Sequence, residues 1–198
     1  MGGISALPES ASSRGLRERK KLQTRLSIRR EAFRLFREQG YSATTIDQIA
    51  EAAGVSSRTF YRYFGVKESV LLSDDLIPPI VAAFADAPRD LTFVAAYRHA
   101  VAKVFATLSP EERDDAATGQ QLMYEIPDAH GLLYGEYVRL IGLIAEALVL
   151  RLEEPTEEFE RRVIAGAIVG VLIAASDNTP LPEDALLRSL AMLDARLS

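Results

Sequence analysis

The chain has 198 residues, of which 48% are hydrophobic and 26% charged, values that suit a globular protein with a sizeable core. It contains no cysteine, which excludes disulfide scaffolds, thiolate metal sites and cysteine nucleophiles, and its two histidines (His99 and His130) leave little material for a zinc site. The longest uncharged apolar run, Val163 to Ala175, is too short to span a bilayer, and no apolar signal segment opens the chain. We therefore expect a cytoplasmic protein without a cofactor and without a membrane partner.

The net charge of −5 hides a strong asymmetry between two parts of the chain. Residues 1–67 contain thirteen Lys/Arg and six Asp/Glu, a net charge of +7, whereas residues 68–198 contain ten and twenty-two, a net charge of −12. This asymmetry indicates a polyanion-binding part joined to an acidic part with a different task. Residues 1–15, rich in Gly, Ser, Ala and Pro, are expected to form a disordered arm before a basic domain over 16–67 and an acidic domain over 68–198.

Helical periodicity and helix-capping residues cover nearly all of the chain after the arm. Ile28, Ala32 and Phe36 share one face of a first helix, which Gly40 ends. No hairpin signal or sustained alternation predicts a strand, so the predicted fold class is all-α. The nine or so predicted helices cover about residues 17–39, 45–53, 57–64, a fourth from 67 that Pro78-Pro79 must break or kink, 90–108, 110–126, 129–152, 155–176 and 182–197.

Two short helices joined by a tight turn form a helix-turn-helix pattern over residues 45–64. Thr45 and Gln48 fit a capping box at the start of the first of these helices. Gly54 supplies a left-handed turn, and Ser56 can cap the second helix. The second helix is then free to lie in the major groove of DNA.

The polar face of that second helix fits contact with DNA. Arg58 can donate two hydrogen bonds to a guanine, and hydroxyls at helix starts suit phosphate oxygens. The alternative is an ordinary helical hairpin with a solvated face, and the local charge of +7 favours DNA. The candidate DNA-binding residues from this reasoning are Thr45, Ser56, Ser57, Arg58, Thr59, Tyr61 and Arg62.

Residues 25–71 carry a specific pattern of apolar, small and capping residues. It consists of Ile28, Ala32, Leu35-Phe36, Gly40-Tyr41, Thr44-Thr45-Ile46, Ile49-Ala50, Ala53-Gly54-Val55-Ser56, Thr59-Phe60-Tyr61, Tyr63-Phe64 and Lys67-Glu68. This pattern resembles the N-terminal domain of TetR-family transcriptional regulators. The resemblance implies a homodimeric, all-helical repressor whose first three helices bind a double-stranded DNA operator and whose other helices bind a small molecule and form the dimer.

The resemblance also implies roles for individual residues. It places Ser57, Arg58 and Tyr61 against bases. Because the family varies at the base-reading positions, Ser57 and Arg58 do not identify an operator. It assigns phosphate contacts to Thr45, Thr59, Tyr61, Tyr63 and Lys67. The basic residues of the arm and first helix either enter a minor groove or lie near phosphate; they are Arg14, Arg17, Arg19, Lys20 and Lys21.

Two features of the acidic half predict a dimer. Gly166, Gly170 and Ala174 recur every four residues and allow two helix faces to approach closely. The last helix offers further apolar candidates for the same interface, and the resemblance implies a four-helix contact made by the last two helices of each subunit. The alternative is a core helix within a single chain. The leucines assigned to the interface are Leu186, Leu190 and Leu193.

Aromatic residues gather in the acidic half, where an apolar cavity with a few hydroxyls would suit a ligand. For each of them the alternative is ordinary core packing. The candidate cavity residues are Phe93, Tyr97, Phe105, Met123, Tyr124, Tyr134 and Tyr137. The acidic half, with Tyr61–Glu68 followed by Ser73–Asp75, is also similar to TetR-like regulators that sense acyl-CoA thioesters, so the expected effector is an acyl-CoA or another largely apolar molecule.

The leading hypothesis is a repressor that binds a palindromic operator as a homodimer and that a small effector releases. The alternative is a regulator that needs no ligand or that activates transcription. Titration with candidate ligands separates a ligand-independent regulator from the leading hypothesis. An enzyme with an accessory DNA-binding domain is disfavoured because the sequence has no Ser/His/Asp spacing, phosphate loop or run of metal ligands.

Overall fold

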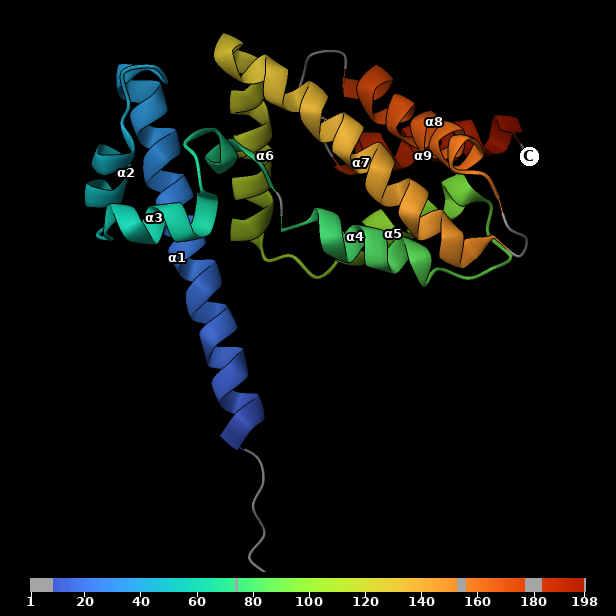
Figure 1. Cartoon of the computed structure of the whole chain (residues 1–198), viewed down its shortest axis with the longest axis horizontal. Coiled ribbons are helices and arrows are strands. Elements are labelled where there is room, and N and C mark those ends of the chain that lie inside the picture. Colours follow the sequence, from blue (N-terminus) through green and yellow to red (C-terminus); the bar gives the residue numbers. More distant parts are fainter. Residues whose placement is uncertain (1–8, 74, 153–155, 177–182, 198) are drawn as a thin grey trace, which may run out of the picture. The chain divides into compact units, whose positions relative to one another are not determined.

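The computed structural model describes residues 9–73, 75–152, 156–176 and 183–197, apart from the side chains of residues 9–15, 128, 130 and 197. Every regular element within these ranges is a helix, which confirms the all-α prediction. The chain divides into two compact units, Met1–Val70 and Leu71–Ser198. The described elements are α1 (Glu9–Gln39), α2 (Ile46–Ala52), α3 (Ser57–Phe64), η1 (Glu68–Leu71), α4 (Ile77–Ala85), α5 (Phe93–Phe105), α6 (Pro110–Glu125), η2 (Pro127–Ala129), α7 (His130–Arg151), α8 (Glu158–Ser176) and α9 (Glu183–Leu197) (Figure 1).

The first unit is built on the apolar face that helical periodicity predicted. Ile28 and Ala32 of α1 are fully buried, as are Ile49 of α2 and Phe60 of α3. Gly40 has a φ of 87°, the left-handed conformation expected at the end of α1. The three helices therefore share one small core, and α1 is the longest of them.

The start of the first helix differs from the expectation. The first helix begins at Glu9 rather than near Arg17, because residues 9–21 are mostly good helix formers and contain no proline. Residues 9–15 of the expected arm are thus helical, and residues 1–8 lie outside the described residues, as do the expected helix starts at residues 155 and 182.

The expected break at Pro78-Pro79 is also corrected. No helix runs from Lys67 to these prolines, since η1 ends at Leu71 and α4 begins at Ile77. The two prolines occupy the first turn of α4, where a missing N–H leaves no hydrogen bond unmade. They begin a helix here rather than ending one.

Five helices of the second unit share one apolar core. α7 packs against α4 and α8, and α5 packs against α4 and α9 (Figure 1). Phe84, Ile144, Ile168 and Leu190 are among the fully buried side chains of this core. Among the described residues, α6 contributes no side chain to it. None of the helices in the described ranges is both long enough and apolar enough to cross a membrane.

Arg151, at the end of α7, is buried and binds backbone rather than a carboxylate among the described residues. Its Nη1 donates to the carbonyl oxygens of Phe84 at 3.0 Å and Ala87 at 2.7 Å, and its Nη2 donates to that of Pro88 at 2.9 Å. The guanidinium also lies 5.4 Å from the centre of the Phe84 ring. Because the last carbonyls of a helix lack partners within it, Arg151 completes the end of α4 and ties it to α7.

We expect Arg151→Met to lower the free energy of unfolding by about 3 kcal/mol, because several buried carbonyls would lose their donor. Urea denaturation followed by circular dichroism measures this loss. Arg188→Met is the matched control: Arg188 is exposed and, among the described residues, pairs with Asp184, so its removal should leave the free energy of unfolding nearly unchanged. Equal effects of the two substitutions would contradict the role given to Arg151.

Candidate nucleic-acid interface and ligand cavity

Hydrogen bonds within the turn fix the starts of α2 and α3. Thr45 Oγ1 accepts from the Gln48 amide at 3.2 Å and Gln48 Oε1 accepts from the Thr45 amide at 2.8 Å, which confirms the predicted capping box. Ser56 Oγ accepts from the Thr59 amide at 3.1 Å, as expected for the cap of α3. Gly54 lies between the helices with a φ of 67°, where a side chain would be strained.

The two faces of α3 differ sharply in exposure. Phe60 and Phe64 are buried against the core of the first unit, with exposed fractions of 0% and 6%. Arg58, Tyr61 and Arg62 lie on the opposite side and are exposed. Arg58 makes no hydrogen bond or ion pair with any residue that the structure describes. Its guanidinium is therefore available to an external acceptor.

The hydroxyls of Ser57 and Thr59, like those of Thr45 and Ser56, already have partners within the motif. Ser57 Oγ donates to Asp47 Oδ1 at 2.6 Å and so links α3 to α2. Thr59 Oγ1 lies 3.0 Å from Ser56 Oγ, within hydrogen-bond distance. A base contact by Ser57 would have to compete with this internal hydrogen bond, whereas Arg58 has no such competitor.

Lys67 also has internal partners, which changes the role expected for it. Its Nζ donates to the carbonyl oxygens of Tyr41 at 2.9 Å and Thr44 at 3.0 Å, and lies 4.1 Å from the centre of the Tyr41 ring. The side chain therefore fastens the segment after α3 to the turn between α1 and α2. Tyr63 is half-buried, and the guanidinium of Arg62 lies 5.4 Å from the centre of its ring.

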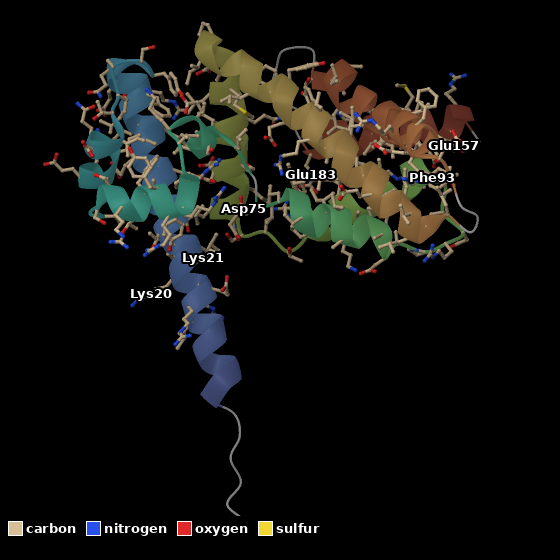
Figure 2. The ribbon with its side chains drawn as sticks, viewed as in Figure 1. Lys20, Lys21, Asp75, Phe93, Glu157 and Glu183 are labelled. Atoms are coloured by element: carbon tan, nitrogen blue, oxygen red, sulfur yellow. The ribbon has the colours of Figure 1, made fainter. Side chains whose placement is uncertain are left out.

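The N-terminal part of α1 presents several cations to solvent. Figure 2 shows Lys20 and Lys21 projecting from the helix. Together with Arg17 and Arg19 they are exposed and form no ion pair within the described parts of the chain. The side chain of Arg14 lies outside the described residues. These positions are carried on a helix and not on a disordered arm.

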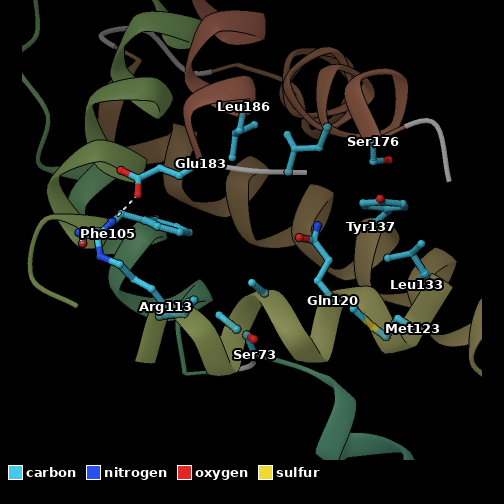
Figure 3. Close-up of a pocket in the computed structure, with 14 residues that line it drawn as sticks. Ser73, Phe105, Arg113, Gln120, Met123, Leu133, Tyr137, Ser176, Glu183 and Leu186 are labelled. Atoms are coloured by element: carbon cyan, nitrogen blue, oxygen red, sulfur yellow. Dashed lines mark hydrogen bonds and ion pairs between the residues drawn. The ribbon is translucent and has the colours of Figure 1, made fainter. Parts of the chain in front are cut away.

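The second unit contains a cavity of about 390 Å³, between α6 and the helices of the core (Figure 3). This volume is within the range of small-molecule sites. Most of the lining is apolar, and all of it comes from the second unit. The lining residues are Ser73, Leu76, Phe105, Arg113, Ala116, Ala117, Gln120, Met123, Leu133, Tyr137, Leu172, Ser176, Glu183 and Leu186.

An ion pair occupies one end of the cavity. Arg113 Nη1 binds Glu183 Oε2 at 2.5 Å, and this contact joins α6 to α9 (Figure 3). The same guanidinium donates to the carbonyl oxygens of Phe105 and Leu108 at the end of α5. The positive charge at this end is therefore already matched by a carboxylate and two carbonyl dipoles.

Hydroxyl groups occupy the opposite end of the cavity, where Figure 3 shows Tyr137 beside Ser176. The Tyr137 hydroxyl lies 3.3 Å from that of Tyr124. Burial, followed by the hydrogen bond with Tyr124, raises the pKa of Tyr137 to about 12. The phenol is consequently protonated at neutral pH and can both donate and accept a hydrogen bond.

Three of the seven predicted cavity residues line the cavity, namely Phe105, Met123 and Tyr137. Tyr124 is not among the described lining residues, and its hydroxyl lies 3.3 Å from that of Tyr137. Tyr134 does not line it, since its side chain is 72% exposed. Leu133 and Tyr137 are four residues apart and share the inward face of α7, whereas Tyr134 follows Leu133 by one residue, a rotation of about 100°.

Tyr97 and Phe93 belong to the packing of the core instead of the cavity lining. Tyr97 is 2% exposed and packs edge-on against the Phe84 ring, with the ring centres 6.0 Å apart. Burial raises the pKa of its phenol. The sequence reasoning missed Arg113 and Glu183, which are 70 residues apart and follow no shared pattern. Within the described ranges, no group of three or more acidic or histidine side chains is placed to hold a metal ion.

One face of α8 is apolar and open to solvent. Gly166 and Gly170 lie on it, and a Cβ atom added at either would meet nothing within 4 Å. Phe159, Val163 and Ile173 surround them with exposed fractions of 76%, 55% and 47%. Their spacing is that of a single helical face, so this signal was present in the sequence and was missed. Ala174 is exposed beside them.

The leucines of α9 are placed differently from the expectation. Leu186 and Leu190 are 9% and 0% exposed and belong to the core of the second unit, so they are removed from the predicted interface. Leu193 is half-buried against the same core. Leu186 and Leu190 are buried because α9 packs its leucine face against α5 and α8 of the same chain.

Comparison with known proteins agrees with both units. A family model described as "Bacterial regulatory proteins, tetR family" matches residues 28–73, and one described as "MftR C-terminal domain" matches residues 91–198. The HTH-type transcriptional regulator TcmR of Streptomyces glaucescens is 36% identical over 176 residues, which cover 86% of this chain and 67% of TcmR.

Shorter and more distant relatives fit the same assignment. The HTH-type transcriptional regulator HbdR of Aromatoleum sp. is 55% identical over 40 residues, 20% of this chain and 18% of HbdR. A TetR-family regulator from Streptomyces coelicolor has the same fold, with a TM-score of 0.53 and 19% identity, covering 97% of this chain and 98% of that one. With a family model over more than half of its residues, the chain belongs to the TetR family of transcriptional regulators, which are DNA-binding proteins and not enzymes.

Proposed function

We propose that this TetR-family regulator is a ligand-responsive repressor that binds a palindromic operator as a homodimer and is released by a small, largely apolar effector. The observation that carries the proposal is the exposed face of α3, where Arg58 and Tyr61 project from a helix whose other face is buried through Phe60. The proposed place of action is the cytoplasm, where the operator DNA lies.

In the proposed complex α3 lies in the major groove with its first turn nearest the bases. Arg58 and Tyr61 would contact base edges, and Ser57 would do so only by giving up its hydrogen bond to Asp47. The remaining candidates would bind phosphates and thereby fix the register on the duplex. These phosphate-binding residues are Thr45, Ser56, Thr59, Arg62 and Tyr63.

The proposed partner on the open face of α8 is a second copy of this chain. Exposed apolar side chains from Phe159 to Ile173 surround two glycines that allow close approach. A two-fold dimer buries the same patch of both subunits and would present two copies of α3 to one palindrome. Half-sites about 34–36 Å apart place both recognition helices on the same side of the duplex.

The proposed effector site is the cavity beside α6. A ligand that binds one conformation of the dimer better than another shifts the population toward it, and operator and ligand then oppose each other reciprocally. The helices that line the cavity include α8, which also carries the proposed dimer face. An effect of the ligand on the dimer can therefore pass through one helix. In the described structure η1 ends at Leu71 and α4 begins at Ile77, so the single helix expected between Lys67 and Pro78 has no part in this coupling.

Arg58→Ala should erode sequence discrimination. We expect it to cost about 1–3 kcal/mol on DNA that the protein itself selects from a random pool, with little change on unselected DNA. Fluorescence anisotropy with both DNAs measures the difference. An equal loss on the two would show that Arg58 binds phosphate and reads no base.

Lys67→Met should weaken DNA binding through the fold and not through a missing charge at the phosphates. Its Nζ holds the turn between α1 and α2, so the dependence of affinity on salt should stay nearly unchanged. Arg62→Met is the comparison, and it should reduce the slope of log K against log salt by about 0.9 for each phosphate that the variant no longer neutralises. If Lys67→Met flattens the slope as much, Lys67 binds phosphate as the family resemblance implies.

Gly170→Leu should convert the dimer into monomers, because a leucine side chain would hold the two α8 faces apart. Within the subunit a Cβ atom added at this position meets nothing within 4 Å, so the circular dichroism spectrum should be unchanged. Gly135→Leu, on an exposed and equally open position of α7, is the control and should remain dimeric. Analytical ultracentrifugation distinguishes the two, and a dimeric Gly170→Leu variant would move the interface elsewhere.

A further inference from the structure

We infer that the cavity selects an uncharged, largely apolar molecule that carries a hydroxyl or carbonyl group at one end, and that it discriminates against carboxylates and other anions. The inference deepens the proposed function and rests on it, since the cavity is taken as the effector site. The effector expected from the sequence is an acyl-CoA or another largely apolar molecule, and the inference commits to the neutral class.

The charges of the described cavity lining disfavour an anionic ligand. Among the described residues that line it, Arg113 and Glu183 carry the charges, and they are bound to each other at 2.5 Å. A ligand carboxylate at Arg113 would have to share the guanidinium with Glu183, so that two carboxylates would compete for one positive charge. Two like charges in a partly desolvated site repel each other more strongly than in water.

The charge around the cavity also disfavours an anionic ligand. Residues 68–198, which contain all of the lining, carry ten Lys/Arg and twenty-two Asp/Glu. The net charge of −12 gives this part of the chain a negative potential that lowers the local concentration of anions. A neutral ligand meets no such electrostatic barrier. A bound carboxylate would need a positive partner inside the protein, and a mobile cation from the solvent does not replace one.

The hydroxyl groups at the opposite end of the cavity suit a neutral polar group. Tyr137, Tyr124 and Ser176 bring hydroxyl groups together there, and the Ser176 hydroxyl donates to the Ile173 carbonyl at 3.0 Å. A hydroxyl oxygen has two lone pairs and can accept from a ligand besides an internal partner, and the protonated Tyr137 phenol can donate to one. Neutral donors and acceptors of this kind match a hydroxyl or a carbonyl, and they offer a carboxylate no compensating charge.

Between the two ends the lining is mostly apolar, and the Gln120 amide and the Ser73 hydroxyl are its neutral polar groups (Figure 3). Leu76, Met123, Leu133, Leu172 and Leu186 come from four helices and the segment before α4. They would remove the apolar body of a ligand from water, which supplies the affinity, while the hydroxyl end sets the orientation.

Two pairs of probes test this selection: 1-decanol with decanoate, and 2-naphthol with 2-naphthoate. Each pair shares a skeleton and differs in charge at neutral pH. Isothermal titration of the full chain should show that at least one alcohol binds, about tenfold more tightly than its carboxylate partner. Tyr137→Phe should weaken the alcohol about fivefold, whereas Tyr134→Phe, which alters an exposed hydroxyl, should not.

Glu183→Gln gives the sharper test. It frees Arg113 and should raise the affinity for the carboxylate about tenfold, which removes or reverses the preference. Asp184→Asn removes the same charge one residue away, from an exposed pair with Arg188, and should leave the preference intact. The inference is overturned if the wild-type chain prefers the carboxylates, if it binds none of the four probes, or if the two substitutions act alike.

Binding of the ligand-free chain to DNA that it selects from a random pool is measured in parallel. If that DNA binds and the carboxylates are preferred, the proposed function as a DNA-binding regulator is supported and the inference about ligand charge fails. If no DNA is selected, the proposed function fails whatever the probes do.

Discussion

The burial of Phe60 and Phe64 is the interaction on which the first unit depends. An isolated helix of eight residues is unstable in water, so α3 exists because its two rings are packed against α1 and α2. Arg25 of α1 adds to this packing, with its guanidinium 4.9 Å from the centre of the Phe64 ring. Burial on one side also fixes the direction of the opposite side, and the exposed position of Arg58 follows from it.

The second unit is packed in one part and hollow in another. Arg151 and the fully buried side chains close the part formed by α4, α5 and α7. α6 faces the remaining space with small residues, Ala116 and Ala117, and is tied to α9 through Arg113. Leu172 and Ser176 of α8 line this space, while Gly170 and Ile173 lie on the outward face of the same helix. A ligand and a second subunit would thus touch opposite sides of α8.

Local signals predicted the fold and the DNA-facing motif well. Capping residues such as Thr45 and Ser56, and a left-handed glycine such as Gly54, act over a few residues and can be read from spacing alone. The cavity was predicted only in part, because Tyr97 and Tyr134 are the same residue type and only tertiary packing decides that one is buried and the other exposed. Pairing over a long sequence separation, as between α6 and α9, leaves no trace in periodicity.

The hydrogen bond between Ser57 and Asp47 separates stability from recognition within α3. Residues that hold the helix in place are bonded or buried, whereas the Arg58 side chain has no partner among the described residues. Tyr61 lies between these cases, since it is 53% exposed and its ring lies edge-on to that of Phe60, with the ring centres 6.1 Å apart. Substitution of Arg58 is therefore nearly free of a folding penalty. If α3 reads DNA as proposed, a duplicated copy of this chain would drift toward a new operator most readily at Arg58, while a change at Ser57 would have to be matched by one at Asp47.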